Sequence, residues 1–162
     1  MALNEMLKKN ISSLTFVFVV FFLDRFSKFI ILKLSEPTGE LNFSVTTFIN
    51  LNLVWNNGIA FGLFSFEQNI YYNLITMIII FVTLAIIWFA FKSTGVEKIG
   101  YLMIMGGSFG NIFDRLYYSS VIDFIDISYN NFHWFIFNVA DMFITSGVII
   151  LIVLEFLKIK KI

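Results

Sequence analysis

The sequence predicts a mainly α-helical membrane protein with four transmembrane helices and a small extracytoplasmic β-sheet between the first and second helices. Hydrophobic residues make up 59% of the 162-residue chain and charged residues only 14%, whereas soluble domains carry roughly 25% charged residues. Four apolar stretches approach the roughly 20 residues that are needed to cross the hydrocarbon core of a bilayer. No internal repeat divides the chain, so residues 1–162 are expected to form a single integral-membrane domain.

The predicted helices cover residues 11–34, 70–91, 99–116 and 137–157. The first helix follows Lys8 and Lys9, as the apolar core of a signal peptide would. However, it is longer than such a core, it contains Asp24, Arg25 and Lys28, and it lacks a small-residue cleavage site. We therefore expect it to be retained as a helix.

The predicted sheet lies in segment 40–66. From Phe43 to Leu53, apolar side chains occupy most odd positions, and polar side chains such as Asn50 and Asn52 fall between them. This alternation is typical of strands with one apolar face. A small sheet on the membrane surface is expected here.

Positive charges predict the orientation of the helices, because cytoplasmic loops are enriched in lysine and arginine. Seven lysines flank the same ends of the predicted helices: Lys8, Lys9, Lys92, Lys98, Lys158, Lys160 and Lys161. The opposite segments, 35–69 and 117–136, carry mainly acidic residues. Both termini are therefore predicted to be cytoplasmic, with these two segments on the outer side.

The composition also excludes several kinds of chemistry. Cysteine is absent and His133 is the single histidine, so disulfides, thiol nucleophiles and zinc sites rich in cysteine or histidine are not expected. The formal net charge is zero and no dense face of lysine or arginine is visible, so no nucleic-acid partner is expected.

Polar residues within apolar helices are costly, and each such cluster is therefore a candidate for function. Asp24 and Lys28 are four residues apart in the first predicted helix and can pair on one face. A structural ion pair explains them equally well. Asn56 and Gly58 belong to a second cluster after the predicted strands, where an Asn-Gly turn is a sufficient explanation.

A third cluster lies at the outer end of the third predicted helix. The spacing of Asn111, Asp114 and Arg115 places all three side chains on one helical face. Gly106 and Gly110 form a small-xxx-small pair, which lets another helix approach closely. Packing is a sufficient reason for these glycines.

The fourth cluster contains Asp123, Asn138 and Asp141. Taken alone, Asn138 is a helix N-cap and Asp141 a first-turn acid stabilised by the helix dipole. The predicted topology, however, brings both aspartates to the outer membrane surface. Two carboxylates in an apolar site share a proton, so one can activate water while the other polarises a peptide carbonyl. This chemistry is metal-free peptide hydrolysis.

Two other functions use residues of the same chain. A serine protease would pair Ser108, within a Gly-x-Ser-x-Gly match, with His133, but that motif requires a strand-to-helix elbow and here lies in an apolar helix. A small proton- or ion-coupled transporter would use Asp24, Asp123 and Asp141. Such transporters usually have internal repeats and acids at the membrane midplane, whereas these acids are predicted near one surface.

The four clusters, in this order and at these spacings, resemble the motifs of the lipoprotein signal peptidases (signal peptidase II). The matching segments are residues 23–28, 56–61, 106–115 with Asp123 and Phe124, and 137–141. The resemblance covers nearly the whole chain. Two residues depart from it: Ser119 stands where the family usually has glycine, and Phe135 where it often has proline.

The resemblance implies that Asp123 and Asp141 are the catalytic pair of an aspartic endopeptidase in the bacterial inner membrane. Its substrates would be prolipoproteins, cleaved before a cysteine that carries a diacylglyceryl group, and its other partners membrane lipids. Neither a cofactor nor a metal is implied, and a monomer is expected. The residues implied to bind substrate or order the site are Asp24, Lys28, Asn56, Gly58, Asn111, Asp114, Arg115 and Asn138.

Overall fold

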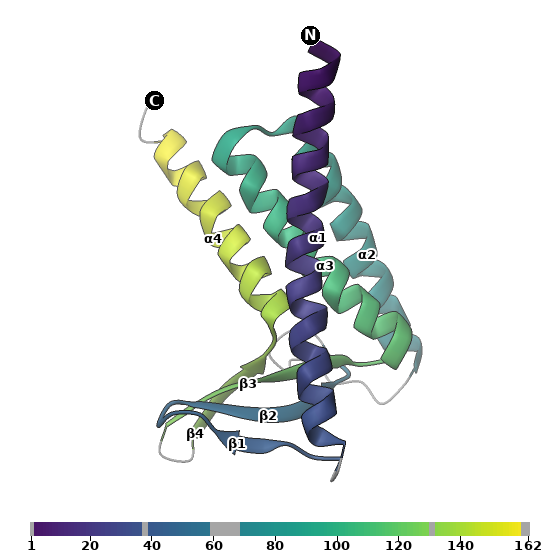
Figure 1. Ribbon diagram of the computed structural model, residues 1–162, viewed down its shortest axis with the longest axis vertical. Helices are drawn as coiled ribbons and strands as arrows, with labels where there is room; N and C mark the ends of the chain where they lie inside the picture. Colours follow the sequence, from purple (N-terminus) through teal and green to yellow (C-terminus); the bar gives the residue numbers. More distant parts are fainter. Residues whose placement is uncertain (1, 37–38, 59–68, 130–131, 160–162) are drawn as a thin grey trace.

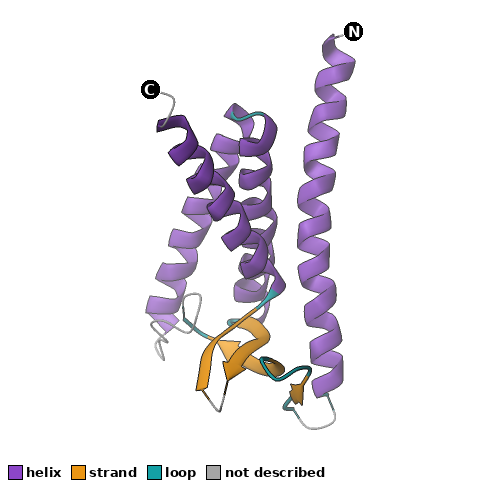
Figure 2. Cartoon of the chain, turned by 90° about the vertical axis from the view of Figure 1, so that its left-hand side faces the viewer, coloured by secondary structure: helices purple, strands orange, loops and turns teal. Residues whose placement is uncertain are grey.

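The structure, a computed structural model, describes residues 2–36, 39–58, 69–129 and 132–159. Its helices are α1 (Ala2–Ser35), α2 (Asn69–Lys92), α3 (Gly95–Tyr118) and α4 (Val139–Ile159). Its strands are β1 (Asn42–Ser44), β2 (Ile49–Asn56), β3 (Val121–Tyr129) and β4 (Phe132–Phe137). The helices run roughly side by side, and the strands form a layer across the end of the bundle opposite both termini (Figures 1 and 2).

Helix α3 is the centre of the bundle and packs against α1, α2 and α4. Glycines allow this close approach, as the sequence predicted for Gly106 and Gly110. A Cβ atom at Gly106 would lie 2.7 Å from the Val20 side chain on α1. One at Gly107 would lie 2.5 Å from the Ala140 carbonyl on α4. The two neighbouring helices therefore pack almost directly on the backbone of α3.

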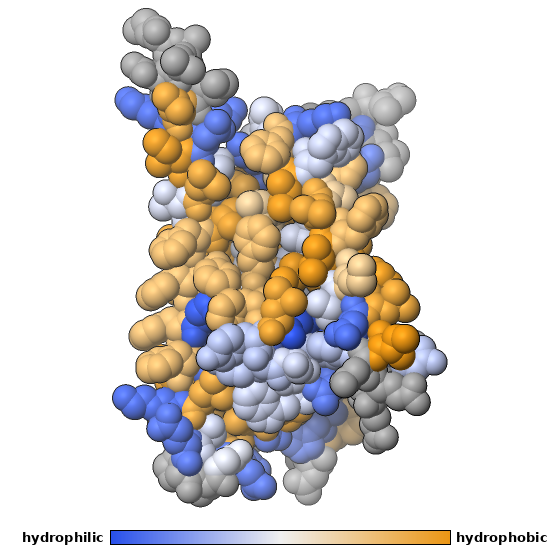
Figure 3. Space-filling view, turned by 90° about the vertical axis from the view of Figure 1, so that its right-hand side faces the viewer, coloured by the Kyte–Doolittle hydropathy of each residue, from blue (hydrophilic) through white to orange (hydrophobic). Residues whose placement is uncertain are grey.

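Two of the described helices are long and apolar enough to cross a membrane: Ile70–Lys92 and Val139–Lys158. Helices α1 and α3 have the necessary length but carry buried charged residues, among them Asp24, Lys28 and Asp114. On the face seen in the space-filling view, apolar residues extend across the middle of the molecule, and hydrophilic residues gather toward both ends and at the lower border of the apolar region (Figure 3).

The sheet is larger than the sequence analysis predicted. It has four antiparallel strands in the order β1-β2-β3-β4, and the predicted segment 40–66 supplies only β1 and β2; residues 59–66 of that segment lie outside the described residues. Strands β3 and β4 follow α3 instead and were not predicted. Polar and apolar residues alternate only in the second half of β3, from Ile125 to Tyr129. Its first half is buried and, apart from Asp123, entirely apolar, as in a strand that is covered on both faces.

At the junction between sheet and helices, the start of the fourth helix differs from the predicted one. The fourth helix was predicted from residue 137, but it begins at Val139, because Phe137 still pairs with Ile125 in the sheet. Below the bundle, Ile31 of α1 packs against Ile122 and Phe124 of β3 in an apolar cluster. This cluster fixes the sheet against the end of the bundle and so fixes the position of β3.

Candidate active site

Asp123 lies on β3 at the junction between sheet and helices and is only 2% exposed. One carboxylate oxygen accepts a hydrogen bond from the Asn138 side-chain amide at 2.6 Å, and the other accepts one from the Asn56 amide at 2.8 Å. Asn56 ends the neighbouring strand β2, and Asn138 lies just before α4. The Asp123 carboxylate is therefore held by two residues from separate parts of the chain, the end of β2 and the segment between β4 and α4.

Asp141 lies in the first turn of α4, where it forms a reciprocal cap with Asn138. The Asp141 backbone N–H donates to the Asn138 side-chain oxygen at 3.0 Å, and the Asn138 backbone N–H donates to the Asp141 carboxylate at 3.2 Å. The interpretation of Asn138 as a helix cap is thus confirmed. The same side chain also binds Asp123, so capping and ordering of the site are combined in one residue.

A chain of amides connects the two carboxylates. Asn138 donates to Asp123 and also to the side-chain oxygen of Asn111 at 3.2 Å. Asn111 in turn donates to Asp141 at 2.8 Å and accepts from the buried Lys28 ammonium at 3.1 Å. Because each amide uses both its donor and its acceptor, the orientation of the Asp123 and Asp141 side chains is strongly restricted.

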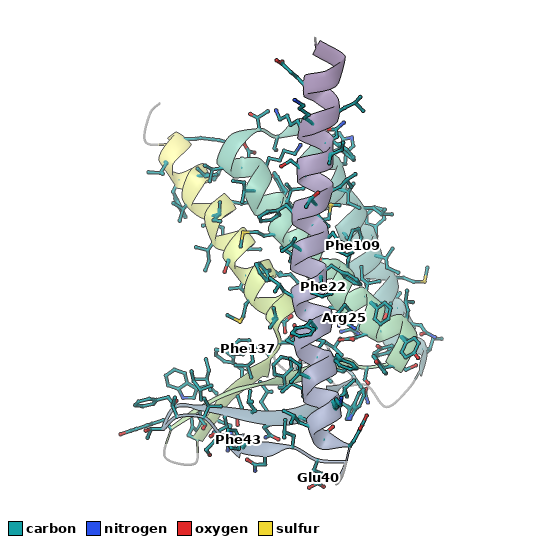
Figure 4. The ribbon with its side chains drawn as sticks, in the orientation of Figure 1. Phe22, Arg25, Glu40, Phe43, Phe109 and Phe137 are labelled. Atoms are coloured by element: carbon teal, nitrogen blue, oxygen red, sulfur yellow. The ribbon has the colours of Figure 1, made fainter. Side chains whose placement is uncertain are left out.

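Next to the amides lies a buried network of four charges on α1 and α3. Lys28 pairs with Asp24 at 3.1 Å, as predicted, and with Asp114 at 2.6 Å. Arg25 also bridges these two aspartates, at 2.7 Å and 2.5 Å, and lies on the side of α1 nearest the lower part of α3 (Figure 4). Two cations thus balance two carboxylates in a site where an unpaired charge would be very costly.

The charge network also fixes the backbone next to Asp123 and next to Asp141. Asp114 accepts a hydrogen bond from the Ile122 backbone N–H at 3.2 Å, which fixes β3 next to Asp123. Asp24 accepts one from the Ala140 backbone N–H at 3.0 Å, next to Asp141. Arg25 was not among the predicted site residues, although its position beside Asp24 within an apolar helix was a signal for it.

Arg115 and Gly58 meet at the edge of the same region. The Arg115 guanidinium donates to the Gly58 carbonyl and lies 5.2 Å above the Tyr72 ring. The Gly58 N–H donates to the Asn56 side-chain oxygen at 2.8 Å in an Asx turn. All eight residues predicted to order the site therefore lie in one connected cluster with Asp123 and Asp141; residues 59–61 of the second motif lie outside the described residues.

A cavity of about 410 Å³ between α2, α3 and α4 is lined in part by Asp123 and Asp141. Its walls are mainly apolar side chains, including Ile79, Ile104 and Val148. Burial, together with the nearby charge of Asp141, raises the pKa of the Asp123 carboxyl from 3.8 to about 7. A proton shared between the two acids at neutral pH is therefore expected.

The residues of the serine-protease alternative lie in different environments. Ser108 is a buried residue of α3 that lines the cavity. His133 lies on the sheet, where its Nδ1 atom is 2.7 Å from the Asp126 carboxylate and its side chain is 53% exposed. Within the described part of the chain, no hydrogen bond joins Ser108 to His133, and no three acidic or histidine side chains are grouped as for a metal ion.

Solved structures show the same arrangement of helices and sheet. One bacterial membrane enzyme superposes with a TM-score of 0.71 at 30% sequence identity, covering 91% of this chain and 88% of its own. A second superposes with a TM-score of 0.69 at 28% identity. Fold and site together therefore define a mainly helical bacterial membrane enzyme whose polar centre lies where the bundle meets a small sheet.

The sequence comparisons define the family. The family model described as signal peptidase (SPase) II matches residues 16–157. A lipoprotein signal peptidase of Pelagibacter ubique is 46% identical over 92% of this chain and 90% of its own length. Another, of Anaplasma phagocytophilum, is 37% identical over 94% and 96%. The chain belongs to the signal peptidase II family and is therefore a peptidase.

Proposed function

We propose that this peptidase is an aspartic endopeptidase in which Asp123 and Asp141 carry out the reaction. The observation that carries the proposal is the arrangement of these two buried carboxylates, oriented by Asn56, Asn111 and Asn138, in the lining of an apolar cavity. The eight surrounding residues order this pair or contact the substrate.

The pair acts with one shared proton. The ionised carboxylate takes a proton from water as the water oxygen attacks the scissile carbonyl carbon. The protonated carboxyl donates a hydrogen bond to the carbonyl oxygen and supports the tetrahedral intermediate. The proton taken from water then passes to the leaving amine as the C–N bond breaks. The amides of Asn56 and Asn138 keep the Asp123 oxygens in place throughout.

The proposed substrates are prolipoproteins, because the curated relatives are named lipoprotein signal peptidases. Cleavage falls before a cysteine that carries a diacylglyceryl group. The apolar walls of the cavity suit a substrate of this kind, whose signal segment and acyl chains both avoid water.

The proposed topology has four membrane spans, cytoplasmic termini and a site near the outer face of the bacterial inner membrane. The described lysines Lys8, Lys9, Lys92, Lys98 and Lys158 flank the helix ends that lie opposite the sheet. This distribution agrees with the positive-inside rule. The carboxylates lie toward the sheet end of the bundle, and a monomer suffices because one chain supplies all site residues.

The test is cleavage of a diacylated prolipoprotein by the purified protein in detergent, measured as a shift on a gel. Asp123→Asn and Asp141→Asn are each expected to lower the rate by about 10²–10⁴-fold, because each removes one proton-transfer group. The matched control is Asp126→Asn, another buried aspartate of β3 that pairs with His133 outside the site. The control, Ser108→Ala and His133→Ala are expected to keep most of the activity.

Folding of each variant is checked by its thermal transition. Persistent cleavage by folded Asp123→Asn or Asp141→Asn protein contradicts the assignment of the pair. Loss of cleavage in both Ser108→Ala and His133→Ala favours the serine-protease alternative instead. Equal cleavage of precursors with and without the diacylglyceryl group contradicts the proposed substrate class.

A further inference from the structure

A second cavity, of about 200 Å³, lies between α1, α2 and α3 at the lysine-rich end of the bundle. Its apolar walls are formed by side chains from all three helices: Leu14, Val17, Ala90, Phe91, Leu102 and Met105. Its polar lining consists of Asn10, Ser13 and Lys98. None of these residues belongs to the candidate active site, so this cavity needs an explanation of its own.

The cavity follows from the way in which the helices pack. Helices α1 and α2 each pack along α3 but scarcely contact one another. Val17, Ala90 and Leu102 form a small buried cluster where the three helices meet. All three residues also line the cavity, and the Ala90 side chain is the smallest of them, so the cavity is an apolar crevice beside this cluster.

The charges around the crevice favour an anion. Among the described residues, the Lys98 ammonium has no carboxylate partner, whereas the neighbouring Glu97 pairs with Lys158 at 3.5 Å. Lys92 at the end of α2 lies 3.6 Å above the ring of Trp88, which is 53% exposed. Tryptophan and lysine in this arrangement are typical of the boundary between hydrocarbon and headgroups.

We propose that this crevice binds an anionic phospholipid, with one acyl chain between α1 and α2 and the phosphate at Lys98. The apolar walls exclude water and match the chain, while Lys98 supplies the positive charge. Asn10 and Ser13 lie on the same side and can hydrogen-bond the headgroup. Basic pockets between transmembrane helices recognise lipids by this combination of charge and apolar surface.

The test uses native mass spectrometry of the purified full-length protein with added lipids. Phosphatidylglycerol is compared with phosphatidylcholine that carries the same acyl chains. We expect about five-fold more phosphatidylglycerol adduct than phosphatidylcholine adduct on the wild-type protein, since one lysine near the surface supplies about that preference. Equal retention of the two lipids overturns the proposal.

The site is located with two variants of equal charge change. Lys98→Gln is expected to remove the five-fold preference. Lys158→Gln, at the same end of the molecule but paired with Glu97 and Glu155, is expected to keep it. An equal loss in both variants shows that the preference comes from the overall charge of this end and overturns the assignment to the crevice.

The role of the acyl chain is tested separately. Ala90→Leu fills the crevice and is expected to reduce binding of both lipids, with the thermal transition as a check of folding. Inorganic phosphate is expected to leave the bound phosphatidylglycerol in place. Displacement of the lipid by inorganic phosphate alone shows that the occupant is a free anion and overturns the proposal. The measurement does not depend on cleavage, so it stands apart from the proposed function.

Discussion

Asp123 combines deep burial with two fixed hydrogen-bond donors, Asn56 and Asn138. These donors favour the ionised form of the carboxyl, yet burial and the nearby Asp141 raise its pKa to about 7. The desolvation of the carboxyl is thus the stronger effect. A carboxyl with this pKa holds or releases its proton near neutral pH, which suits acid–base catalysis.

The pH dependence of cleavage follows from this pKa. The proposed pair works while it shares one proton, and it loses that proton as the pH rises through about 7. We therefore expect kcat to fall above about pH 7, approaching ten-fold for each further pH unit. Single-turnover cleavage between pH 5.5 and pH 9 measures this decrease, and a flat profile over that range contradicts it.

Stability gives an independent measure of the same titration. Asp123 is protonated in the folded protein and ionised in the unfolded chain between about pH 4 and pH 7. Stability should therefore fall with rising pH in this window, by up to about 1.4 kcal/mol per pH unit, and become independent of this group above it. Asp123→Asn should lack this contribution, and thermal unfolding of the two proteins across the window compares them.

Ser119 shows local backbone strain. It ends α3 in the left-handed conformation with φ 56° and ψ 20°, and it is the only non-glycine residue of the described chain with positive φ. A Cβ atom is unfavourable in this conformation. The family's usual glycine at this position thus has a physical reason.

Ser119→Gly is therefore expected to stabilise the protein by about 0.5–1 kcal/mol, because glycine adopts the left-handed conformation without strain. The measurement is the shift in the thermal unfolding midpoint in detergent. Ser120→Gly is the control, since its backbone is not left-handed, and it should be neutral or destabilising. A lower midpoint for Ser119→Gly than for the wild type contradicts the explanation.

At the scale of elements, α3 organises the site because it contacts every other helix. Its polar face carries Asn111, Asp114 and Arg115, and Gly107, one turn before Asn111 on the same face, lets α4 approach closely. Asp114 binds both cations of α1 and the backbone of β3. Asp114 therefore joins α3 to α1 and to β3, and its charge is balanced by the two cations of α1.

Gly107→Ala tests whether this close packing positions Asp141. The added Cβ would lie 2.5 Å from the Ala140 carbonyl and 2.8 Å from the Ile144 side chain, so the start of α4 must move. We expect a loss of about 1–3 kcal/mol in stability and a decrease in kcat of more than ten-fold. Ser108→Ala, on the next residue of α3, is the control for both measurements. Unchanged cleavage by Gly107→Ala contradicts this role of the packing.

At the scale of the whole molecule, five of the seven described lysines lie toward the helix ends opposite the sheet, whereas Lys28 and Lys33 of α1 lie toward the sheet (Figure 1). Exposed apolar side chains cover the helices between these ends. An apolar surface of this extent is typical of a protein that lies in a membrane. Under the proposed function, the position of Asp123 and Asp141 at the junction of bundle and sheet lets a substrate enter from the membrane.

The absence of cysteine allows a direct test of the topology. Val45→Cys places a thiol on the exposed turn after β1, and Thr94→Cys places one between α2 and α3. In intact cells, a membrane-impermeant maleimide should label Val45→Cys but not Thr94→Cys. After permeabilisation both should react. The reverse pattern contradicts the proposed orientation.

The sequence alone determined those features that depend on local spacing. Composition and apolar length predicted the four helices, and the four-residue spacing of Asp24 and Lys28 predicted their ion pair. The position of Asn138 before an apolar run predicted its capping role. The ion pair and the cap each depend on residues within one helical turn, and each helix depends on one continuous apolar stretch. Their geometry therefore follows from the order of residues along the chain.

Only the tertiary structure decided the features that join distant segments. Strands β3 and β4 were not predicted because neither alternates along its whole length. The first half of β3 is buried and nearly all apolar, and β4 is nearly all apolar although most of it is exposed. The partnership of Arg25 with Asp114, 89 residues away, and the amide chain through Asn111 depend on how helices pack around glycines. Such contacts have no local signal, because the packing of separate elements decides which side chains meet.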